Sequence, residues 1–384
     1  MSNTLSFKIY DSIITLPAEW DELADANIFL SRNYLKVLEK APPENMVCHF
    51  IGLFEDRALV GIALSQFLDL NALATFGKRD RCLKTMARNF IFRNFASHVL
   101  FIGNNMLTGQ NAFVLAEKTN IVEAICALKH ATAELKTVFK AKGKKIHITA
   151  FKDFKENVIS YFATPDFRNN YQFSTQPNMV FSVRENWKSE QDYINALSKK
   201  YRDQYKRARK KSDGIEKRKM NLAEIIASED TIYDLYRHVA ENAPFNTFFL
   251  PKNHFRVFKE ELKDTFLFYG YFFEGKLIGF NTLVKNGEAL DTYFLGYDDV
   301  LQREKMLYLN MLYDMVAYAV NKGYKEIIFA RTALEIKSSV GAEPTKMYGF
   351  MEHERQFLNP IMDTIFTYLE PESIWQQRHP YKEV

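Results

Sequence analysis

The chain has 384 residues, of which 47% are hydrophobic and 26% charged, and its net charge at pH 7 is +4. This composition excludes a disordered or collagen-like chain, and the length predicts two globular domains. No apolar run is long enough to predict a membrane span, and the first residues lack the pattern of a secretory signal.

The sequence does not indicate metal or disulfide chemistry. The three cysteines, Cys48, Cys82 and Cys126, are far apart, and the eight histidines form no HxxxH or HExxH motif. We therefore expect reduced thiols, no metal site and a cytoplasmic protein. Peripheral contact with a membrane stays open.

The first half of the chain predicts four elements in this order: a helix over 33–40, a β-hairpin over 50–61, a long amphipathic helix over 121–143 and a strand after it. The hairpin sequence FIGLFEDRALVG places two apolar runs around the charged pair Asp56-Arg57. Gly143 suits the C-cap of the long helix. We expect these elements to form a first module over residues 1–183.

The same order of elements recurs in the second half, which indicates an internal duplication. FYGYFFEGKLIG (268–279) aligns without a gap on the first hairpin, and FFLPKNHFRVF (248–258) aligns on IFLSRNYLKVL (28–38). A second long helix over 304–323 ends at Gly323 and precedes the strand-like run KEIIFA. We therefore predict an α+β protein of two tandem modules, each a mixed, mostly antiparallel sheet flanked by helices. The second module, with a C-terminal tail, would span residues 184–384.

A strongly basic segment opens the second module. Residues 189–211 predict one helix that carries four residues on one face: Tyr193, Leu197, Tyr201 and Tyr205. Residues 199–219 hold eleven Lys and Arg against three Asp and Glu, a local net charge of +8. A solvated helix face and a nucleic-acid-binding surface both fit this pattern.

Three stretches of the second module resemble the GNAT acyltransferase superfamily, and within it the FemAB-like branch of peptidoglycan-peptide-type transferases with tandem GNAT domains. The helix LSKKYRDQYKRARKK, with Arg202 and Lys206, is similar to the basic helix of that branch. The run 271–298 looks like the β-meander that ends in the tyrosine-bearing strand of the family. GYKEIIFARTALEIK looks like its terminal lysine motif, at Lys337. For the first module, the resemblance to this superfamily rests only on the internal duplication.

The resemblance implies transfer of an acyl or aminoacyl group from an activated thioester or ester onto an amine. The donor would lie in a V between two splayed parallel strands, here Ala289–Gly296 and Lys325–Ala330. Asp291 and Tyr293 are two apart on a strand and so face one side of the sheet, where they would line the chemistry.

Lys337 and Arg331 would hold an anionic group next to that chemistry. The alternatives are a solvated loop lysine at Lys337 and a hydrogen-bonded structural aspartate at Asp291. The first module would be a degenerate copy that serves as scaffold, because its strand KIHITAFKDF lacks the RTALEIK continuation.

The class of donor depends on the turn before the long helix. CoA-using GNATs place a Q/R-x-x-G-x-G/A turn there, whose backbone N–H groups approach the pyrophosphate. The run QREKML keeps Gln302, but Lys305 and Leu307 stand in place of the glycines. Arg303 and Lys305 would meet phosphate only as point charges. We expect no tightly bound cofactor, and acyl-CoA, acyl carrier protein or aminoacyl-tRNA as co-substrate.

The expected acceptor is a small-molecule or lipid-linked amine, and a tRNA or an acyl carrier protein would dock on the basic helix. The alternative is a non-catalytic GNAT-fold protein that binds RNA or an anionic surface through residues 199–219. In that case Tyr201 and Tyr205 would stack on bases between the cationic side chains.

Overall fold

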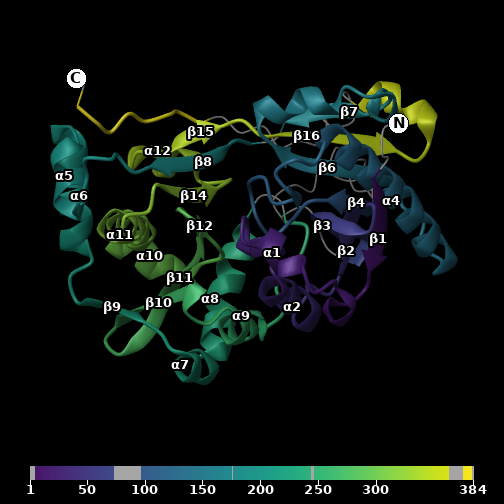
Figure 1. Cartoon of the computed structure of the whole chain (residues 1–384). Helices are drawn as coiled ribbons and strands as arrows, with labels where there is room; N and C mark the ends of the chain where they lie inside the picture. Colours follow the sequence, from purple (N-terminus) through teal and green to yellow (C-terminus); the bar gives the residue numbers. More distant parts are fainter. Residues whose placement is uncertain (1–4, 73–96, 175, 244–245, 363–374, 383–384) are drawn as a thin grey trace. The chain divides into compact units, whose positions relative to one another are not determined.

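The computed structural model describes residues 5–72, 97–174, 176–243, 246–362 and 375–382. These residues form two compact units, each with an eight-stranded mixed sheet flanked by helices (Figure 1). The first unit comprises Met1–Thr175, Pro244–Pro251 and Lys346–Glu372, and the second comprises Gln176–Ala243, Lys252–Thr345 and Ser373–Val384. The predicted α+β class with two tandem modules is confirmed.

The first unit has one sheet with the strand order β1-β2-β3-β4-β6-β16-β7, and β5 also pairs with β3. Its strands are β1 (Ser6–Tyr10), β2 (Met46–Glu55), β3 (Ala58–Asp69), β4 (His98–Ile102), β5 (Phe113–Leu115), β6 (Ile148–Phe154), β7 (Tyr171–Ser174) and β16 (Tyr348–His353). Its described α-helices are α1 (Trp20–Ala24), α2 (Arg32–Lys40) and α4 (Ile121–Ala141).

The second unit repeats this sheet with the order β15-β8-β14-β12-β11-β10-β9, and β13 also pairs with β11. Its strands are β8 (Asn178–Ser182), β9 (Ile215–Lys219), β10 (Phe266–Phe273), β11 (Lys276–Asn286), β12 (Ala289–Thr292), β13 (Gly296–Tyr297), β14 (Glu326–Ala330) and β15 (Glu343–Thr345). Its α-helices are α5 (Glu190–Ala196), α6 (Lys199–Lys211), α7 (Leu222–Ala227), α8 (Glu229–Asn242), α9 (His254–Leu262), α10 (Asp299–Lys305), α11 (Leu307–Lys322) and α12 (Leu334–Ser339).

The two predicted hairpins have the same detailed geometry, which supports the duplication. Both turn residues have positive φ in each hairpin, at Asp56 and Arg57 and at Glu274 and Gly275, as a tight two-residue turn requires. The register of β2 against β3 shifts between Leu53 and Phe54, and that of β10 against β11 shifts between Tyr271 and Phe272, at aligned positions.

The recurring glycines of these hairpins are explained by close packing. A Cβ atom on Gly52 would lie 3.0 Å from the Phe54 ring, and one on Gly270 would lie 2.8 Å from the Phe272 ring. The side chain of Leu59 would lie 3.1 Å from the Cβ atom on Gly52, and that of Leu277 would lie 3.1 Å from the Cβ atom on Gly270. The Gly, Phe and Leu that recur in the sequence therefore make one contact that is built twice.

One strand of the first sheet, β16, comes from the chain beyond the strands of the second unit. After β7 the chain crosses to the second sheet, where β8 pairs with β14 and β15. After β15 it crosses back, and β16 pairs with β6 and β7 of the first sheet. The units are therefore not the two contiguous modules 1–183 and 184–384, because Lys346–Glu372 belong to the first unit.

Two helices predicted as continuous are broken. The 304–323 helix is interrupted at Met306, which is left-handed (φ 51°), and the Asn310 side-chain amide donates to the Lys305 and Met306 carbonyls at the break. The 189–211 helix is interrupted at Leu197, where the backbone is extended and pairs with Tyr381 of the C-terminal tail. Both long helices end as predicted, since Gly143 and Gly323 have positive φ just beyond α4 and α11.

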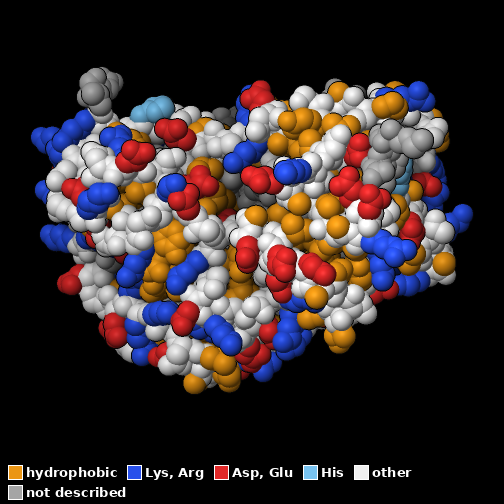
Figure 2. All heavy atoms as spheres, in the orientation of Figure 1, with side chains coloured by type: hydrophobic (Ala, Val, Ile, Leu, Met, Phe, Trp, Pro, Cys, Tyr) orange, Lys and Arg blue, Asp and Glu red, His pale blue; other side chains and the backbone are white. Residues whose placement is uncertain are grey.

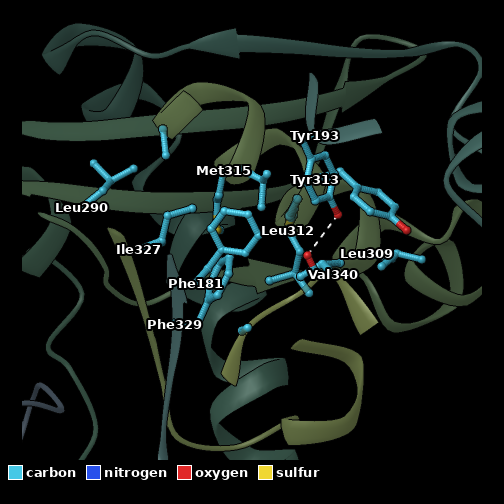
Figure 3. Packing of buried hydrophobic residues seen from close by; sticks show 14 of the residues in the cluster. Phe181, Tyr193, Leu290, Leu309, Leu312, Tyr313, Met315, Ile327, Phe329 and Val340 are labelled. Atoms are coloured by element: carbon cyan, nitrogen blue, oxygen red, sulfur yellow. Dashed lines mark hydrogen bonds between the residues drawn. The ribbon is translucent and has the colours of Figure 1, made fainter. Parts of the chain in front are cut away.

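Helix α11 covers one face of the second sheet and forms the core there. Leu312 and Met315 of the helix pack in one cluster with Leu290 of β12 and Ile327 of β14, and all four are buried (Figure 3). Tyr193 of α5 joins this core and donates its hydroxyl to the Val340 carbonyl at 3.0 Å. The aromatic richness of the second unit is therefore largely core, as its burial predicts.

The structure also describes two of the three cysteines and the length of the apolar helices. Cys48 and Cys126 are free and partly exposed, and Cys82 lies outside the described residues. Among the described residues, no helix has both the length and the apolar character to cross a membrane.

The basic helix α6 is joined to α11 by a partly buried ionic network. The Arg209 guanidinium donates to Asp314 at 2.7 Å and to Glu190 at 3.1 Å. Tyr271 of β10 donates to the second Asp314 oxygen at 2.8 Å, and Tyr205 donates to Glu190 at the same distance. Arg209 is therefore a structural residue, whereas part of the predicted basic face remains in solvent.

We predict that Arg209→Met lowers the free energy of unfolding by about 1.5–3 kcal/mol, because it leaves Asp314 with a partly buried charge whose main partner is lost. Urea denaturation of the full chain measures this change. The matched control is Lys206→Met on the same helix, where the side chain is exposed and the expected change is within about 0.5 kcal/mol. Equal effects of the two substitutions would contradict the structural role of Arg209.

Candidate active site

Strands β12 and β14 are parallel neighbours that separate partway along their length. Three residue pairs join them, and the last is Asp291 opposite Ile328. Beyond this pair, the chain after β12 turns to β11, where Gly296 pairs with Phe280, and β14 shifts its register against β8. The splayed parallel pair predicted from the sequence is thus present, and its opening lies at the carboxyl ends of both strands.

Asp291 lies at the last parallel pair and is 4% exposed. The Asn286 side-chain amide donates to its carboxyl at 3.2 Å. Burial raises the pKa of Asp291 to about 7; the bond from Asn286 opposes this shift, and the negative charge of Glu326 adds to it. A carboxyl with this pKa exchanges a proton close to neutral pH, which is the property of a general base.

Tyr293 continues the same strand line and contacts α9. Its hydroxyl lies 3.0 Å from Nε2 of His254, and its ring packs against that of Phe258 with centroids 4.8 Å apart. Because side chains alternate along a strand, Asp291 and Tyr293 lie on the face opposite Leu290. The site therefore holds a buried carboxyl and a hydroxyl–imidazole pair on one face.

Lys337 reaches back from α12 to the end of β14 and is 5% exposed. Its ammonium donates to three consecutive carbonyls, those of Phe329 at 2.6 Å, Ala330 at 3.3 Å and Arg331 at 2.7 Å. Burial lowers the pKa of Lys337 to about 7. The solvated loop lysine is therefore excluded, and the observed contacts fix the backbone at the opening of the strands.

The segment that Lys337 holds has an unusual backbone. Ala330, Thr332 and Ala333 all have positive φ, which is uncommon for residues other than glycine. Arg331 is half-buried within this segment, and its Nε donates to the Gln176 carbonyl at 2.9 Å. The three ammonium bonds of Lys337 help to stabilise this strained turn.

Gln302, Arg303 and Lys305 all lie on the short helix α10. Arg303 is exposed, Gln302 is half-buried, and the Lys305 ammonium lies over the Phe273 ring, 4.3 Å from its centroid. The carboxylate of Asp298 accepts from the N–H groups of Val300 and Leu301 at the start of this helix. Those N–H groups are already occupied by an anion of the chain itself.

The predicted binding residues Arg202 and Lys206 lie on α6, where Lys206 is exposed and Arg202 half-buried. Six cations of this helix are exposed: Lys199, Lys200, Lys206, Arg207, Lys210 and Lys211. Tyr201 is 6% exposed, and Tyr205 packs against Tyr313 with centroids 4.9 Å apart. Tyr201 is buried and Tyr205 is half-buried, so the fully exposed rings that the stacking alternative needs are not found on this helix.

The first unit has an equivalent opening with different contents. Strands β4 and β6 run parallel up to Ile102 opposite Phe151, and β5 then pairs with β3. Lys152, which follows the last pair, donates to the carbonyls of Asn104 at 2.8 Å and Leu107 at 3.3 Å. The chain's own loop is thus bound at this opening, and Phe329 occupies the position of Lys152 in the second unit.

His254 is a site residue that the sequence reasoning missed. It aligns with Tyr34 in the duplicated blocks, and Tyr34 accepts a hydrogen bond from Asn104 at 2.8 Å. Asn104 stands two residues beyond the last parallel pair of its unit, as Tyr293 does in the second. The alignment of His254 with Tyr34 in the two copies is the sequence feature that could have identified His254 as a candidate. Among the described residues no group of His, Cys, Asp and Glu side chains could hold a metal ion.

We predict that Asp291→Asn stabilises the protein relative to the wild type progressively as the pH rises from about 4 to 7. A pKa raised from 3.8 to about 7 means that the folded wild type keeps a proton that the unfolded chain loses, so its stability falls over this window. The difference grows by up to about 1.4 kcal/mol per pH unit. Denaturation at a series of pH values, with exposed Asp203→Asn as control, measures it. A difference that does not change with pH would contradict the raised pKa.

Comparison with known proteins places this geometry in a fold. No family model matches the sequence, and no curated protein matches it. The chain is similar to the crystal structure of FemX, with 11% identity, coverage of 93% of this chain and 100% of that chain, and a TM-score of 0.55. It is also similar to a tandem GNAT protein from the clavulanic acid biosynthesis pathway, with 8% identity, coverage of 91% and 98%, and a TM-score of 0.50. The chain therefore has the fold that FemX and this tandem GNAT protein share.

Proposed function

We propose that the protein is an acyltransferase that moves an acyl or aminoacyl group from an activated thioester or ester to an amine. The observation that carries this proposal is the opening between β12 and β14, with Asp291 at its last residue pair and Tyr293 just beyond it. An extended donor can bind along strands that have separated, because their backbone groups face it as they would face another strand.

The reaction needs orientation and proton transfer more than covalent chemistry by the protein. The amine nitrogen attacks the donor carbonyl carbon, a C–N bond forms, and the C–S or C–O bond to the carrier breaks. The nitrogen loses one proton, and the leaving thiolate or alkoxide takes one up. We assign Asp291 as the group that accepts the amine proton, because a pKa of about 7 suits this exchange at neutral pH.

Tyr293 with His254 forms the second proton-carrying unit of the proposed site. A hydroxyl 3.0 Å from an imidazole nitrogen can pass a proton without a change of geometry. Lys337 is proposed as a positioning residue, because its ammonium is bound to three backbone carbonyls. Arg331, half-buried in the same turn, is proposed to hold an anionic group of donor or acceptor.

The proposed donor is a carrier-bound or aminoacyl ester group in preference to free acyl-CoA. Two glycines are lacking before the long helix, where Lys305 and Leu307 stand in their place. Without these glycines the backbone N–H groups at the start of the long helix cannot approach a pyrophosphate as they do in CoA-using GNATs. The six exposed cations of α6 supply a docking surface for an acidic carrier, either acyl carrier protein or aminoacyl-tRNA.

The same six cations favour a second candidate function, binding of RNA or another anionic surface without catalysis. The two proposals differ in what the double variant Lys206→Glu, Arg207→Glu would do. It would abolish a binding function, yet it would spare transfer from a small donor such as an acyl thioester of pantetheine. Arg209 must be left intact in this test, because it holds the fold.

We predict transfer to a primary amine from at least one of four donors: acetyl-CoA, long-chain acyl-CoA, acyl carrier protein or aminoacyl-tRNA. With that donor, Asp291→Asn should lower kcat by roughly 10²–10⁴-fold and Tyr293→Phe by a smaller factor. Mass spectrometry of the acylated amine measures the rate, and Asp203→Asn is the control for a lost surface charge. The proposal fails if none of the four donors reacts, or if Asp291→Asn reacts at the wild-type rate.

A further inference from the structure

A pocket of about 450 Å³ in the second unit lies away from the opening of β12 and β14. Its lining consists of three lysines, three tyrosines and one leucine: Lys219, Lys285, Lys322, Tyr269, Tyr318, Tyr324 and Leu267. We call it the lysine–tyrosine pocket. Lys285 lies opposite Leu290 near the start of β12, and Tyr324 precedes β14, so the pocket is at the amino ends of these strands. The proposed transfer site is at their carboxyl ends.

The charge of the pocket has one sign. The lining contains no carboxylate, and only Lys219 has an acidic partner, the exposed Asp264 at 3.2 Å. Within the described part of the chain, neither Lys285 nor Lys322 forms an ion pair. The pKa of Lys259 is lowered first by burial and then by the charge of Lys219; the charge of Asp264 opposes this shift, and that of Lys285 adds to it. The pocket therefore has three lysines in its lining and one ion pair to them, that of the exposed Asp264 with Lys219.

The tyrosines provide flat surfaces beside these charges. The rings of Tyr318 and Tyr324 are nearly parallel, at 25° with centroids 6.2 Å apart, and Tyr269 meets Tyr318 edge-on at 6.1 Å. Burial raises the pKa of all three phenols, so they stay neutral and do not offset the lysines. Figure 2 shows Lys and Arg side chains beside hydrophobic ones over the region where Figure 1 places α11 and β10.

Two carbonyls in the last turn of helix α11, those of Ala319 and Val320, are bonded within the chain. Gly323 donates its N–H to Val320 and Tyr324 donates its N–H to Ala319, which closes the last turn. Lys322 adds a cation in that turn. Lys322 therefore places a positive charge beside the negative end of the helix dipole.

We propose that the lysine–tyrosine pocket binds a nucleoside phosphate. Ammonium groups hold the phosphate as point charges, and neutral aromatic faces stack on a base, which is the combination that nucleotides require. The volume lies within the range of small-molecule sites. A free mononucleotide and one nucleotide of a single-stranded RNA present the same chemistry to this pocket.

Calorimetric titration of the full chain tests the proposal with adenosine monophosphate, uridine monophosphate, adenosine and inorganic phosphate. At least one mononucleotide should bind, and the nucleoside and the phosphate should each bind at least tenfold more weakly. The double variant Lys285→Ala, Lys322→Ala should weaken nucleotide binding at least tenfold, and Tyr318→Leu should also weaken it. The control Lys140→Ala, Lys142→Ala removes the same charge from exposed positions at the end of α4 in the first unit and should leave binding unchanged.

Three outcomes overturn the proposal: no mononucleotide binds, phosphate alone binds as tightly as the nucleotide, or the two double variants weaken binding equally. A four-residue single-stranded RNA distinguishes the sources. Tighter binding of that RNA through Lys285 and Lys322 would assign the pocket to an RNA strand, and equal binding would assign it to free nucleotides. The inference does not depend on the proposed transfer, because Asp291→Asn should retain the nucleotide affinity in full.

Discussion

The separation of β12 from β14 is the constraint on which the candidate site depends. Two paired strands that part leave backbone carbonyls without their ladder partners, and such groups are costly when buried. Lys337 solves this at the end of β14, because one ammonium donates to three successive carbonyls and needs no further strand. The opening is therefore kept by a side chain from α12, and the turn with positive φ at Ala330, Thr332 and Ala333 is held in place.

The duplicated fold uses the same opening in two different ways. In the first unit Lys152 follows the last parallel pair and binds carbonyls of the loop that begins after Ile102. In the second unit Phe329 stands at that position, and the lysine comes from beyond the strand. One opening is thus tied to the chain's own loop, while the other presents a buried carboxyl and a tyrosine–histidine pair. This asymmetry is the reason to assign the chemistry to the second unit.

Local features of the structure could be predicted from the sequence because local residues determine them. The hairpin turns at Asp56-Arg57 and Glu274-Gly275 and the helix ends at Gly143 and Gly323 are of this kind, whereas the parallel pairing of β12 with β14 was expected from the family resemblance. The pairing of β8 in the second sheet and of β16 in the first could not be predicted, because both strands pair with partners distant in sequence. The break at Met306 carries no Gly or Pro, and it depends on Asn310 and on the Ala208 carbonyl of α6.

The sequence predicted the positions of the candidate residues on the strand, but it did not predict their contacts. Asp291 and Tyr293 lie where the strand pattern placed them, but the surroundings that raise the pKa of Asp291 come from burial, which a sequence does not state. Lys337 was expected to meet an anion, and in the structure it meets the backbone. His254 was visible only as a partner of Tyr34 in the alignment of the two copies, since its contact with Tyr293 joins α9 to the strand after β12.

Hydrogen–deuterium exchange in the presence of a saturating, non-transferable donor analogue tests the central claim most directly. The account predicts that the backbone amides of residues 293–297 and 328–331 gain protection, because the donor would bind between the separated strands of the second unit. Residues 103–115 and 151–154 of the first unit should exchange as in the free protein. Protection confined to the first unit, or absent from both openings while the analogue is bound, would contradict the assignment of transfer to the second unit.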